Sequence, residues 1–139
     1  MAYIRDGRIK VDRSRFDLLT TYHEPCNWTR KSEKLFGYGY YDEPRWIIDQ
    51  CIKNRVELYP TRQNQICCGG GGGALVTGYN KERIDYGRRK MNQIKKTGAE
   101  MVVVPCHSCH SQLTNLAEEY DMGELQVKYL WELVADCLV

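Results

Sequence analysis

The sequence lacks a long apolar run. Its longest uninterrupted one is Met101–Val104, whereas a helix needs about 20 apolar residues to cross a bilayer. The first residues, Met1 to Asp6, also lack the apolar core of a secretory signal. We therefore expect no membrane span and a cytoplasmic location, alone or peripheral to a membrane complex. In that reducing compartment structural disulfides are disfavoured.

An excess of charge of one sign is missing as well. The 139 residues hold 20 Lys and Arg against 18 Asp and Glu, a net charge of +2. Proteins that bind nucleic acid carry a broad basic surface, so we expect no nucleic-acid partner. Hydrophobic residues (42%) and charged residues (27%) occur as in ordinary globular proteins, and the length suits one compact domain.

Cysteine is the residue that the sequence has in excess. Seven cysteines are more than packing ordinarily uses and point to metal or redox chemistry. Forty residues separate Cys26 from Cys67, 37 separate Cys68 from Cys106, and two separate Cys106 from Cys109. We call these five the motif cysteines. Cys51 and Cys137 lie on apolar helical faces, where cysteine behaves as a small hydrophobe, so we predict that they belong to the core.

Thiolates clustered in a cytosolic domain favour an iron–sulfur cluster or zinc. The adjacent side chains of Cys67 and Cys68 do not easily reach one small ion together, whereas a larger cluster accommodates both. This favours iron, although the spacing leaves zinc as the alternative. The five glycines that follow, Gly69–Gly73, indicate a backbone that comes very close to another group or takes positive φ angles.

Hydrophobic periodicity and breaker residues predict the secondary structure. The expected strands are Phe16–Tyr22, which delivers Cys26, then Val56–Tyr59, Met101–Val104 and Leu125–Tyr129. The expected helices are Pro44–Asn54, Asn80–Thr97 with Asn80 as N-cap and Gly98 as its stop, Cys106–Tyr120, and Trp131–Leu138. Residues 27–43 are expected to form a loop, and the Asp6-Gly7 pair predicts a hairpin over Ile4–Val11.

Strands therefore alternate with helices, which is typical of an α/β domain with a small, largely parallel sheet flanked by helices. We place a short N-terminal hairpin and linker at residues 1–15 and the cysteine-rich domain at residues 16–139. Ligands of such sheets gather beyond the carboxyl ends of the strands. Since Cys26, Cys67 and Cys106 each follow a predicted strand or its loop, we expect them to converge at this edge.

Three segments resemble one known family: Tyr22-His23-Glu24-Pro25-Cys26, Cys67-Cys68-Gly69-Gly70-Gly71 and Pro105-Cys106-His107-Ser108-Cys109. Together they resemble the cysteine-rich CCG domain of heterodisulfide reductases and their relatives, from about Phe16 to the end. They look most like the C-terminal part of DsrK, a heterodisulfide-reductase-like subunit of a membrane complex in dissimilatory sulfur metabolism. One CCG motif and no ferredoxin-type cysteine run are present, so we expect a fragment or stand-alone domain of a larger electron-transfer system.

The resemblance implies that the motif cysteines bind a noncubane [4Fe-4S] cluster and are both its ligands and the catalytic residues. It implies that the N–H groups of Gly69, Gly70 and Gly71 stabilise this cofactor. The implied activity is an oxidoreductase that reduces or forms a disulfide or trisulfide on a small sulfur-carrier protein. Other iron–sulfur and membrane subunits would be its partners. The rival interpretation is a zinc-stabilised protein-interaction module without turnover.

For several groups of residues the sequence is compatible with two roles. His23, His107 and His110 could deliver protons to a leaving thiolate or be structural. The basic residues of the helix over 80–97 could dock an acidic partner or form a solvated face. The aromatic residues Trp28, Tyr38, Tyr40 and Tyr41 could bind a partner or shield the metal site. The Cys106–His110 segment also matches a haem-attachment motif, but that chemistry requires export, and a thioredoxin-like pair would not come so late in the chain.

Overall fold

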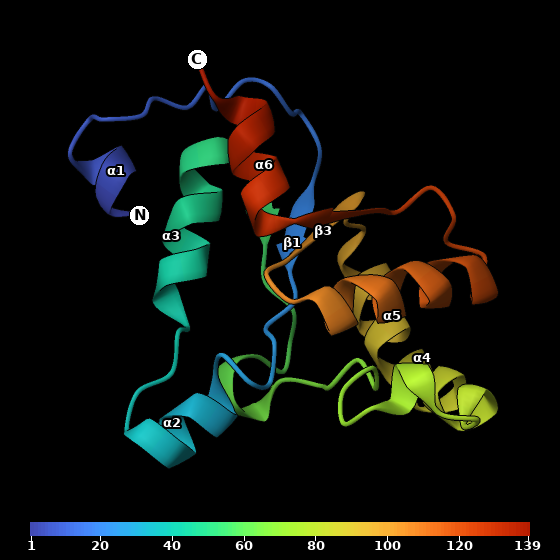
Figure 1. Ribbon diagram of the computed structural model, residues 1–139. Helices are drawn as coiled ribbons and strands as arrows, with labels where there is room; N and C mark the ends of the chain where they lie inside the picture. Colours follow the sequence, from blue (N-terminus) through green and yellow to red (C-terminus); the bar gives the residue numbers. More distant parts are fainter.

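The computed structural model describes all 139 residues and contains one parallel sheet of four strands in the order β2-β1-β3-β4 (Figure 1). The strands are β1 (Thr20–Tyr22), β2 (Arg55–Val56), β3 (Met101–Val104) and β4 (Gln126–Tyr129). All three pairings between neighbouring strands are parallel. The predicted α/β class with a parallel sheet is therefore confirmed.

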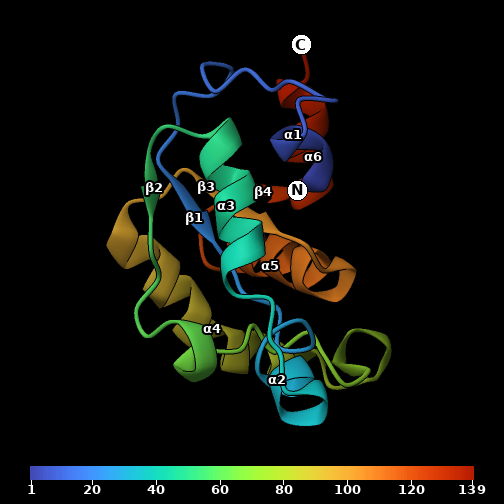
Figure 2. The same ribbon diagram turned by 90° about the vertical axis from the view of Figure 1, so that its left-hand side faces the viewer.

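Two layers of helices cover the sheet (Figures 1 and 2). One face packs against α3 (Asp42–Cys51) and α6 (Leu130–Cys137), and the other against α4 (Asn80–Thr97) and α5 (His107–Glu119). Successive residues of β3 alternate between the two cores, because side chains of a strand point to opposite faces. This is why an unbroken apolar run marks the central strand.

The predicted core cysteines are confirmed. Cys51 and Cys137 are fully buried in the core beneath α3 and α6, and the Cys137 thiol lies 3.8 Å from the carbonyl oxygen of Cys51. They lie on the opposite face of the sheet from the buried motif cysteines Cys68 and Cys109, which belong to the α4–α5 core. The chain thus separates its packing thiols from its clustered ones.

The boundaries of α4 follow the sequence closely at one end. Gly98 ends it in a left-handed conformation (φ +70°), as predicted. Its N-cap is Tyr79 rather than Asn80, and no side chain caps this end. In the middle of α4, Gly87 allows a close approach to α5. A Cβ atom there would lie 2.5 Å from Cδ1 of the buried Leu116.

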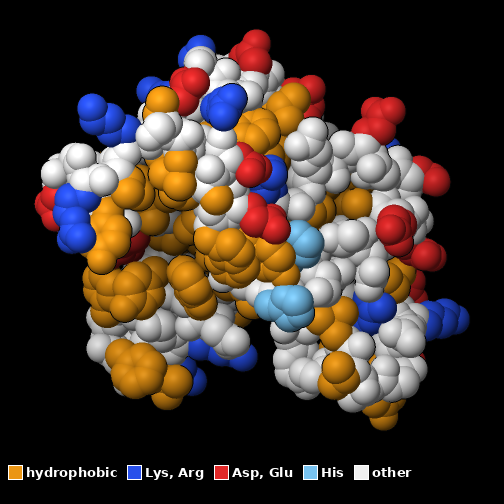
Figure 3. Space-filling model, turned by 45° about the horizontal axis from the view of Figure 1, so that its top comes forward, with side chains coloured by type: hydrophobic (Ala, Val, Ile, Leu, Met, Phe, Trp, Pro, Cys, Tyr) orange, Lys and Arg blue, Asp and Glu red, His pale blue; other side chains and the backbone are white.

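The predicted N-terminal hairpin is wrong. The segment forms the short helix α1 (Ala2–Arg5), and Gly7 uses its positive φ of 68° to end that helix rather than to turn a hairpin. Val11 instead forms an isolated bridge to Leu138. The segment borders an apolar hollow of about 460 Å³ whose lining includes Tyr3, Trp28 and Trp131. In Figure 3 apolar side chains gather on this side of the molecule beside histidine.

The predicted loop over residues 27–43 is also wrong, because it contains α2 (Arg30–Phe36). No residue of α2 is buried, so the helix has no apolar stripe for the sequence to reveal. It is fixed by local bonds: the Thr29 hydroxyl donates to the carbonyl oxygen of Pro25 (2.9 Å), and Gly37 ends the helix at φ +73°. Two short 3-10 helices, Arg62–Asn64 and Ala74–Val76, complete the secondary structure.

The two leading strands are shorter than predicted, since residues 16–19 precede β1 and β2 ends at Val56. None of the helices has the length and apolar character of a bilayer-spanning segment. The carboxyl ends of β1 and β3 lie side by side in the sheet, in the register Tyr22 to Val103. The segments that follow them, with Cys26 and Cys106, therefore begin at one edge of the sheet.

The close packing of α4 on α5 gives a testable prediction. We expect Gly87→Ala to lower the free energy of unfolding by about 1–3 kcal/mol, because the new methyl group overpacks against the fully buried Leu116 side chain. Urea unfolding followed by circular dichroism measures this. Gly123→Ala, where a Cβ atom meets nothing within 4 Å, is the control. Equal stabilities of the two variants would contradict the packing argument.

Candidate metal centre

The five motif cysteines line one cavity of about 430 Å³ at the carboxyl edge of the sheet. Cys26 follows β1, Cys106 follows β3, and the Cys67-Cys68 pair lies in the loop between β2 and α4. The convergence that we predicted for Cys26, Cys67 and Cys106 is confirmed, and Cys68 and Cys109 join them. Cys68 and Cys109 are buried, whereas the other three are half-buried. The cavity thus has a buried side and a side open to solvent.

The cysteines of the third segment lie at the start of α5. Cys106 is the N-cap, so its sulfur lies beside the backbone N–H groups of Ser108 and Cys109 at the positive end of the helix. The hydrogen bond from the Cys109 thiol, together with these N–H groups, lowers the pKa of Cys106 to about 6. The Cys109 thiol also donates a hydrogen bond to Cys68, which lowers the pKa of Cys68 and raises that of Cys109. The site therefore favours thiolates at Cys68 and Cys106.

Cys26 is held by two donors from other elements. The guanidinium of Arg30 on α2 donates to its sulfur at 3.3 Å, and the amide of Gln65 does so at 3.4 Å. Arg30 also bonds the carbonyl oxygen of Gln65 at 3.1 Å, so the two donors fix each other. A hydrogen bond to Cys67 raises the pKa of Cys26, and burial adds to this. The unexpected helix α2 thus supplies a positive charge to the site.

Glycines let the Cys67-Cys68 loop pack tightly on the helices. Gly69 has φ +88°, and a Cβ atom on Gly70 would lie 2.6 Å from Cβ of Gln112 and 2.8 Å from the Ser108 carbonyl oxygen. The amide of the buried Gln112 donates to the carbonyl oxygen of Cys68 at 3.0 Å. The Gly69 N–H donates to the Cys67 sulfur at 3.4 Å, whereas Gly71 faces open space. The predicted cofactor role of these glycines stays a prediction.

Two buried nitrogen groups, those of His23 and Lys90, lie behind the residues that line the cavity. His23 is fully buried, and neither ring nitrogen has a hydrogen-bond partner. One ring nitrogen and the sulfur atoms of Cys68 and Cys109 all lie within 4.8 Å of one another. Burial lowers the pKa of His23 to about 3, and the nearby charge of Lys90 adds to this effect. The imidazole is therefore neutral.

Lys90 corrects the view of α4 as a uniformly solvated basic helix. Its side chain is only 1% exposed, its ammonium donates to Oε1 of Gln93 at 2.5 Å, and no carboxylate lies within ion-pair distance. Burial lowers its pKa to about 8, opposed by the charges of Cys68 and Glu24. A buried cation without a carboxylate partner favours negative charge on the neighbouring sulfur atoms.

The other two histidines have structural partners. His107 bonds the Tyr129 hydroxyl at 2.5 Å, and His110 bonds the carbonyl oxygen of Val127 at 3.1 Å. His110 also stacks on the Tyr129 ring, whose other neighbour is Trp131. In the aromatic segment Trp28, Tyr38 and Tyr40 are exposed while Tyr41 is buried. Its role stays open.

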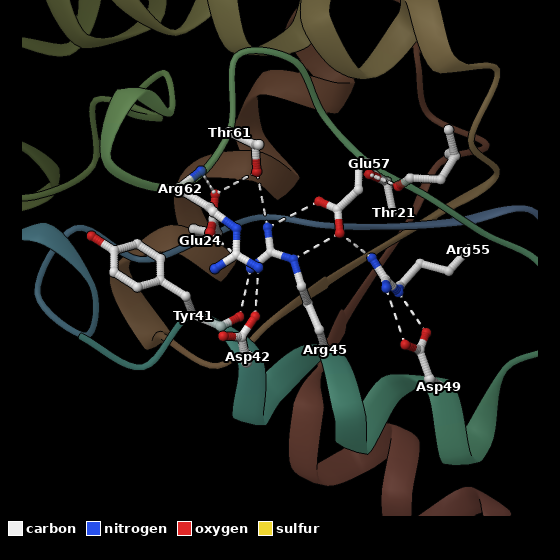
Figure 4. Close-up of polar contacts among 11 residues, drawn as sticks. Thr21, Glu24, Tyr41, Asp42, Arg45, Asp49, Arg55, Glu57, Thr61 and Arg62 are labelled. Carbon is white, nitrogen blue, oxygen red and sulfur yellow. Dashed lines mark hydrogen bonds and ion pairs between the residues drawn. The ribbon is translucent and has the colours of Figure 1, made fainter. Parts of the chain in front are cut away.

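A buried ion pair anchors the segment that carries Cys26 (Figure 4). Arg45 of α3 donates to Glu24 at 2.8 Å and to Glu57 at 2.7 Å, and both Arg45 and Glu24 are buried. Glu24 also accepts hydrogen bonds from the Thr61 hydroxyl (3.1 Å) and the Arg62 backbone N–H (2.6 Å). One carboxylate two residues before Cys26 thus ties its segment to α3 and to the chain leading to Cys67.

Removing this ion pair tests its importance. We expect Arg45→Met to destabilise the protein by about 3–5 kcal/mol, because the buried charge of Glu24 loses its counter-ion. Arg62→Met, which removes an exposed pair with Asp42, is the matched control and should have little effect. Chemical denaturation of the metal-free protein measures both. A loss no larger in Arg45→Met than in the control would contradict the anchoring role.

The buried ammonium gives a pH-dependent prediction. Folded Lys90 has a pKa of about 8 against 10.5 for the free side chain, so the folded state binds fewer protons between these values. The cost of burying its charge is full below pH 8 and disappears as the pH rises to 10.5. In the metal-free protein we expect the stability of Lys90→Met relative to wild type to fall over this window. Denaturation at several pH values checks this, with exposed Lys96→Met as control; a constant difference would contradict it.

Comparisons with known proteins agree with this geometry. The CCG family model, described as a cysteine-rich domain, matches residues 20–114, which include all five motif cysteines. The chain is 34% identical, over 97% of its length, to a probable membrane-anchored ferredoxin of Chromohalobacter salexigens. It is 28% identical, over 99% of its length, to the Hdr-like menaquinol oxidoreductase iron-sulfur subunit of Archaeoglobus profundus.

A third relative is a subunit of the dihydromethanophenazine:CoB–CoM heterodisulfide reductase of Methanosarcina barkeri, 26% identical over 85% of the chain. The chain spans 19%, 25% and 27% of these three relatives, so each is a much longer protein. The resemblance to heterodisulfide reductases and their relatives is confirmed. Since the family model covers most of the chain and all of the motif cysteines, the chain belongs to the CCG cysteine-rich domain family.

Proposed function

We propose that this chain is the electron-transfer catalytic domain of a heterodisulfide-reductase-like oxidoreductase, in which the five motif cysteines hold an iron–sulfur cluster. The observation that carries this proposal is that five thiols from three distant segments line one cavity. Relatives named as iron–sulfur proteins and as oxidoreductase subunits support it. The finer proposal is a noncubane [4Fe-4S] cluster, because the adjacent Cys67 and Cys68 suit a centre with several irons.

The charges around the cavity fit such a group. A thiolate-bound cluster becomes more negative on reduction, and hydrogen bonds and nearby positive charge stabilise that state. The cavity has Arg30 at Cys26 and the N-terminus of α5 at Cys106, and the buried ammonium of Lys90 lies behind its wall. These groups are fixed in place before any cofactor binds. They supply charge compensation rather than acid or base chemistry.

The two sides of the cavity have different roles in this proposal. When bound, the cluster supplies one-electron chemistry and an iron to which a substrate sulfur can bind. Cys68 and Cys109 hold its buried side, while the half-buried Cys26, Cys67 and Cys106 border the side open to solvent. Arg30 and Lys31 line the cavity with them. A substrate therefore approaches from the side that carries these two cations.

The proposed reaction is the reduction or formation of a disulfide or trisulfide on a small sulfur-carrier protein of dissimilatory sulfur metabolism. Because the relatives are much longer than this chain, other iron–sulfur and membrane subunits would deliver the electrons. The domain would lie at the cytoplasmic periphery of such a membrane complex. The sequence likeness to DsrK supports this substrate class.

A zinc-stabilised interaction module without turnover is the second candidate. It is favoured by one observation, the group of His23, Cys68 and Cys109, whose donor atoms lie close enough to share a single ion. Tetrahedral zinc sites take such nitrogen and sulfur ligands. Iron, zinc and acid-labile sulfide content of anaerobically prepared protein separates the two candidates.

Replacement of one buried motif cysteine tests the cluster. We expect Cys68→Ser to lose the visible absorption of the cluster and most of its iron, which amounts to about four atoms per chain in a [4Fe-4S] group. Cys137→Ser, a buried thiol on the other face of the sheet, is the matched control and should keep both. Absorption spectra and metal and sulfide analysis of anaerobic protein measure this. An unchanged spectrum in Cys68→Ser refutes the five-ligand assignment, and stoichiometric zinc without sulfide in wild type refutes the cluster.

A further inference from the structure

We propose that His23 is a metal ligand of this centre and binds a metal atom on the buried side of the cavity together with Cys68 and Cys109. The inference rests on the proposed function only in so far as the cavity holds a metal. It adds a nitrogen donor to the five thiols. Two observations support this proposal: the imidazole lies close to the two sulfur atoms, and neither of its nitrogen atoms has a hydrogen-bond partner.

The backbone fixes the position of His23. Its N–H donates to the carbonyl oxygen of Val103 at 3.0 Å, which extends the pairing of β1 with β3 by one residue. The imidazole is fully buried, and one ring nitrogen lies within 4.8 Å of the sulfur atoms of both Cys68 and Cys109. Metal–nitrogen and metal–sulfur bonds are about 2.0–2.3 Å long, so the three donors have to move only slightly closer together to bind one ion.

The hydrogen-bonding capacity of this imidazole is unmet. A neutral imidazole has one N–H donor and one lone pair, and in His23 neither nitrogen has a partner. Each buried polar group left without a partner costs roughly 1–3 kcal/mol, and native interiors rarely keep one. A metal bond to the lone pair satisfies the acceptor nitrogen of the ring. His107 and His110, by contrast, already have oxygen partners.

No neighbouring residue is bonded to the imidazole in place of a metal. The ammonium of Lys90 donates to Gln93 and to neither ring nitrogen of His23. The carboxylate of Glu24, the residue next to His23 in the chain, is taken by Arg45, Thr61 and the Arg62 N–H. The groups close enough to the imidazole to bind the same metal ion are the sulfur atoms of Cys68 and Cys109. The three donors therefore form the inner wall of the metal site.

Mixed ligation has a consequence for the redox potential. Where histidine replaces thiolate as a ligand to iron, the reduction potential rises, because a neutral donor takes the place of an anionic one. We therefore expect His23→Cys, which replaces the neutral donor with a thiolate, to lower the midpoint potential of the loaded protein. The conservative His107→Gln should leave it unchanged, since His107 bonds Tyr129.

The decisive experiment avoids any change at His23. The chain has three histidines, so a His107→Gln/His110→Gln variant with ¹⁵N-labelled histidine carries the label at His23 alone. We would load it anaerobically with iron and sulfide and record pulsed electron paramagnetic resonance spectra. A ¹⁵N coupling of the size given by a directly bound imidazole supports the proposal. Its absence from a centre that contains iron and sulfide overturns the proposal.

A second loading separates this inference from the proposed function. If the protein takes up no iron or sulfide, the cluster fails, and X-ray absorption of the same variant loaded with zinc alone decides the role of His23. A shell of nitrogen at about 2.0–2.1 Å beside sulfur supports the proposal, whereas an all-sulfur shell overturns it. We expect His23→Ala to weaken zinc binding by more than about 100-fold, above the effect of losing an outer-shell partner. A protein that binds neither metal overturns both proposals.

Discussion

The buried ion pair between Arg45 and Glu24 is the interaction on which the cysteine cavity depends. Glu24 lies between His23 and Pro25, in the segment that leads from β1 to Cys26, and Arg45 comes from the middle of α3. Through the same carboxylate, Thr61 and the Arg62 backbone are tied to this segment, so the chain that leads to Cys67 is held in place as well. A buried pair contributes little net stability but is costly to break, and it fixes two cysteine-bearing segments in one geometry.

Positive groups surround the thiols of the cavity, and they disfavour the state in which all five thiols are protonated. Lys90 is buried without a carboxylate, Arg30 donates to Cys26, and Cys106 lies at the N-terminus of α5. These groups favour thiolates, yet five neighbouring sulfur atoms cannot all be anionic without a cation among them. A bound metal would resolve this conflict, because it would supply the missing positive charge and link binding to folding stability. The preorganised positive charges and the unpartnered imidazole are therefore both consistent with a metal bound in the cavity.

Sequence reasoning predicted the parts of the fold that depend on periodic apolar residues or on glycine stops. The β3 run and the end of α4 at Gly98 are examples, and the strand ends predicted that the cysteines would converge. It failed where local hydrogen bonds decide the structure, as in α2, which buries no side chain, and at Gly7, which ends α1. It also failed for Lys90 and Arg45, since a charged residue in a helix carries no sign of burial when its partners lie far away in the sequence.

The two sides of the cavity are built by different means. The inner wall comes from the loop that carries Cys67 and Cys68 and from α5, which pack closely on each other at Gly70 and Gln112. The outer wall comes from α2 and the chain around Cys26. No side chain of α2 is buried, and this wall is held by single hydrogen bonds. Core packing therefore fixes the buried cysteines Cys68 and Cys109, whereas the outer wall can change without disturbing the sheet. A domain built in this way can keep one metal centre while the surface presented to a substrate differs among longer proteins that contain it.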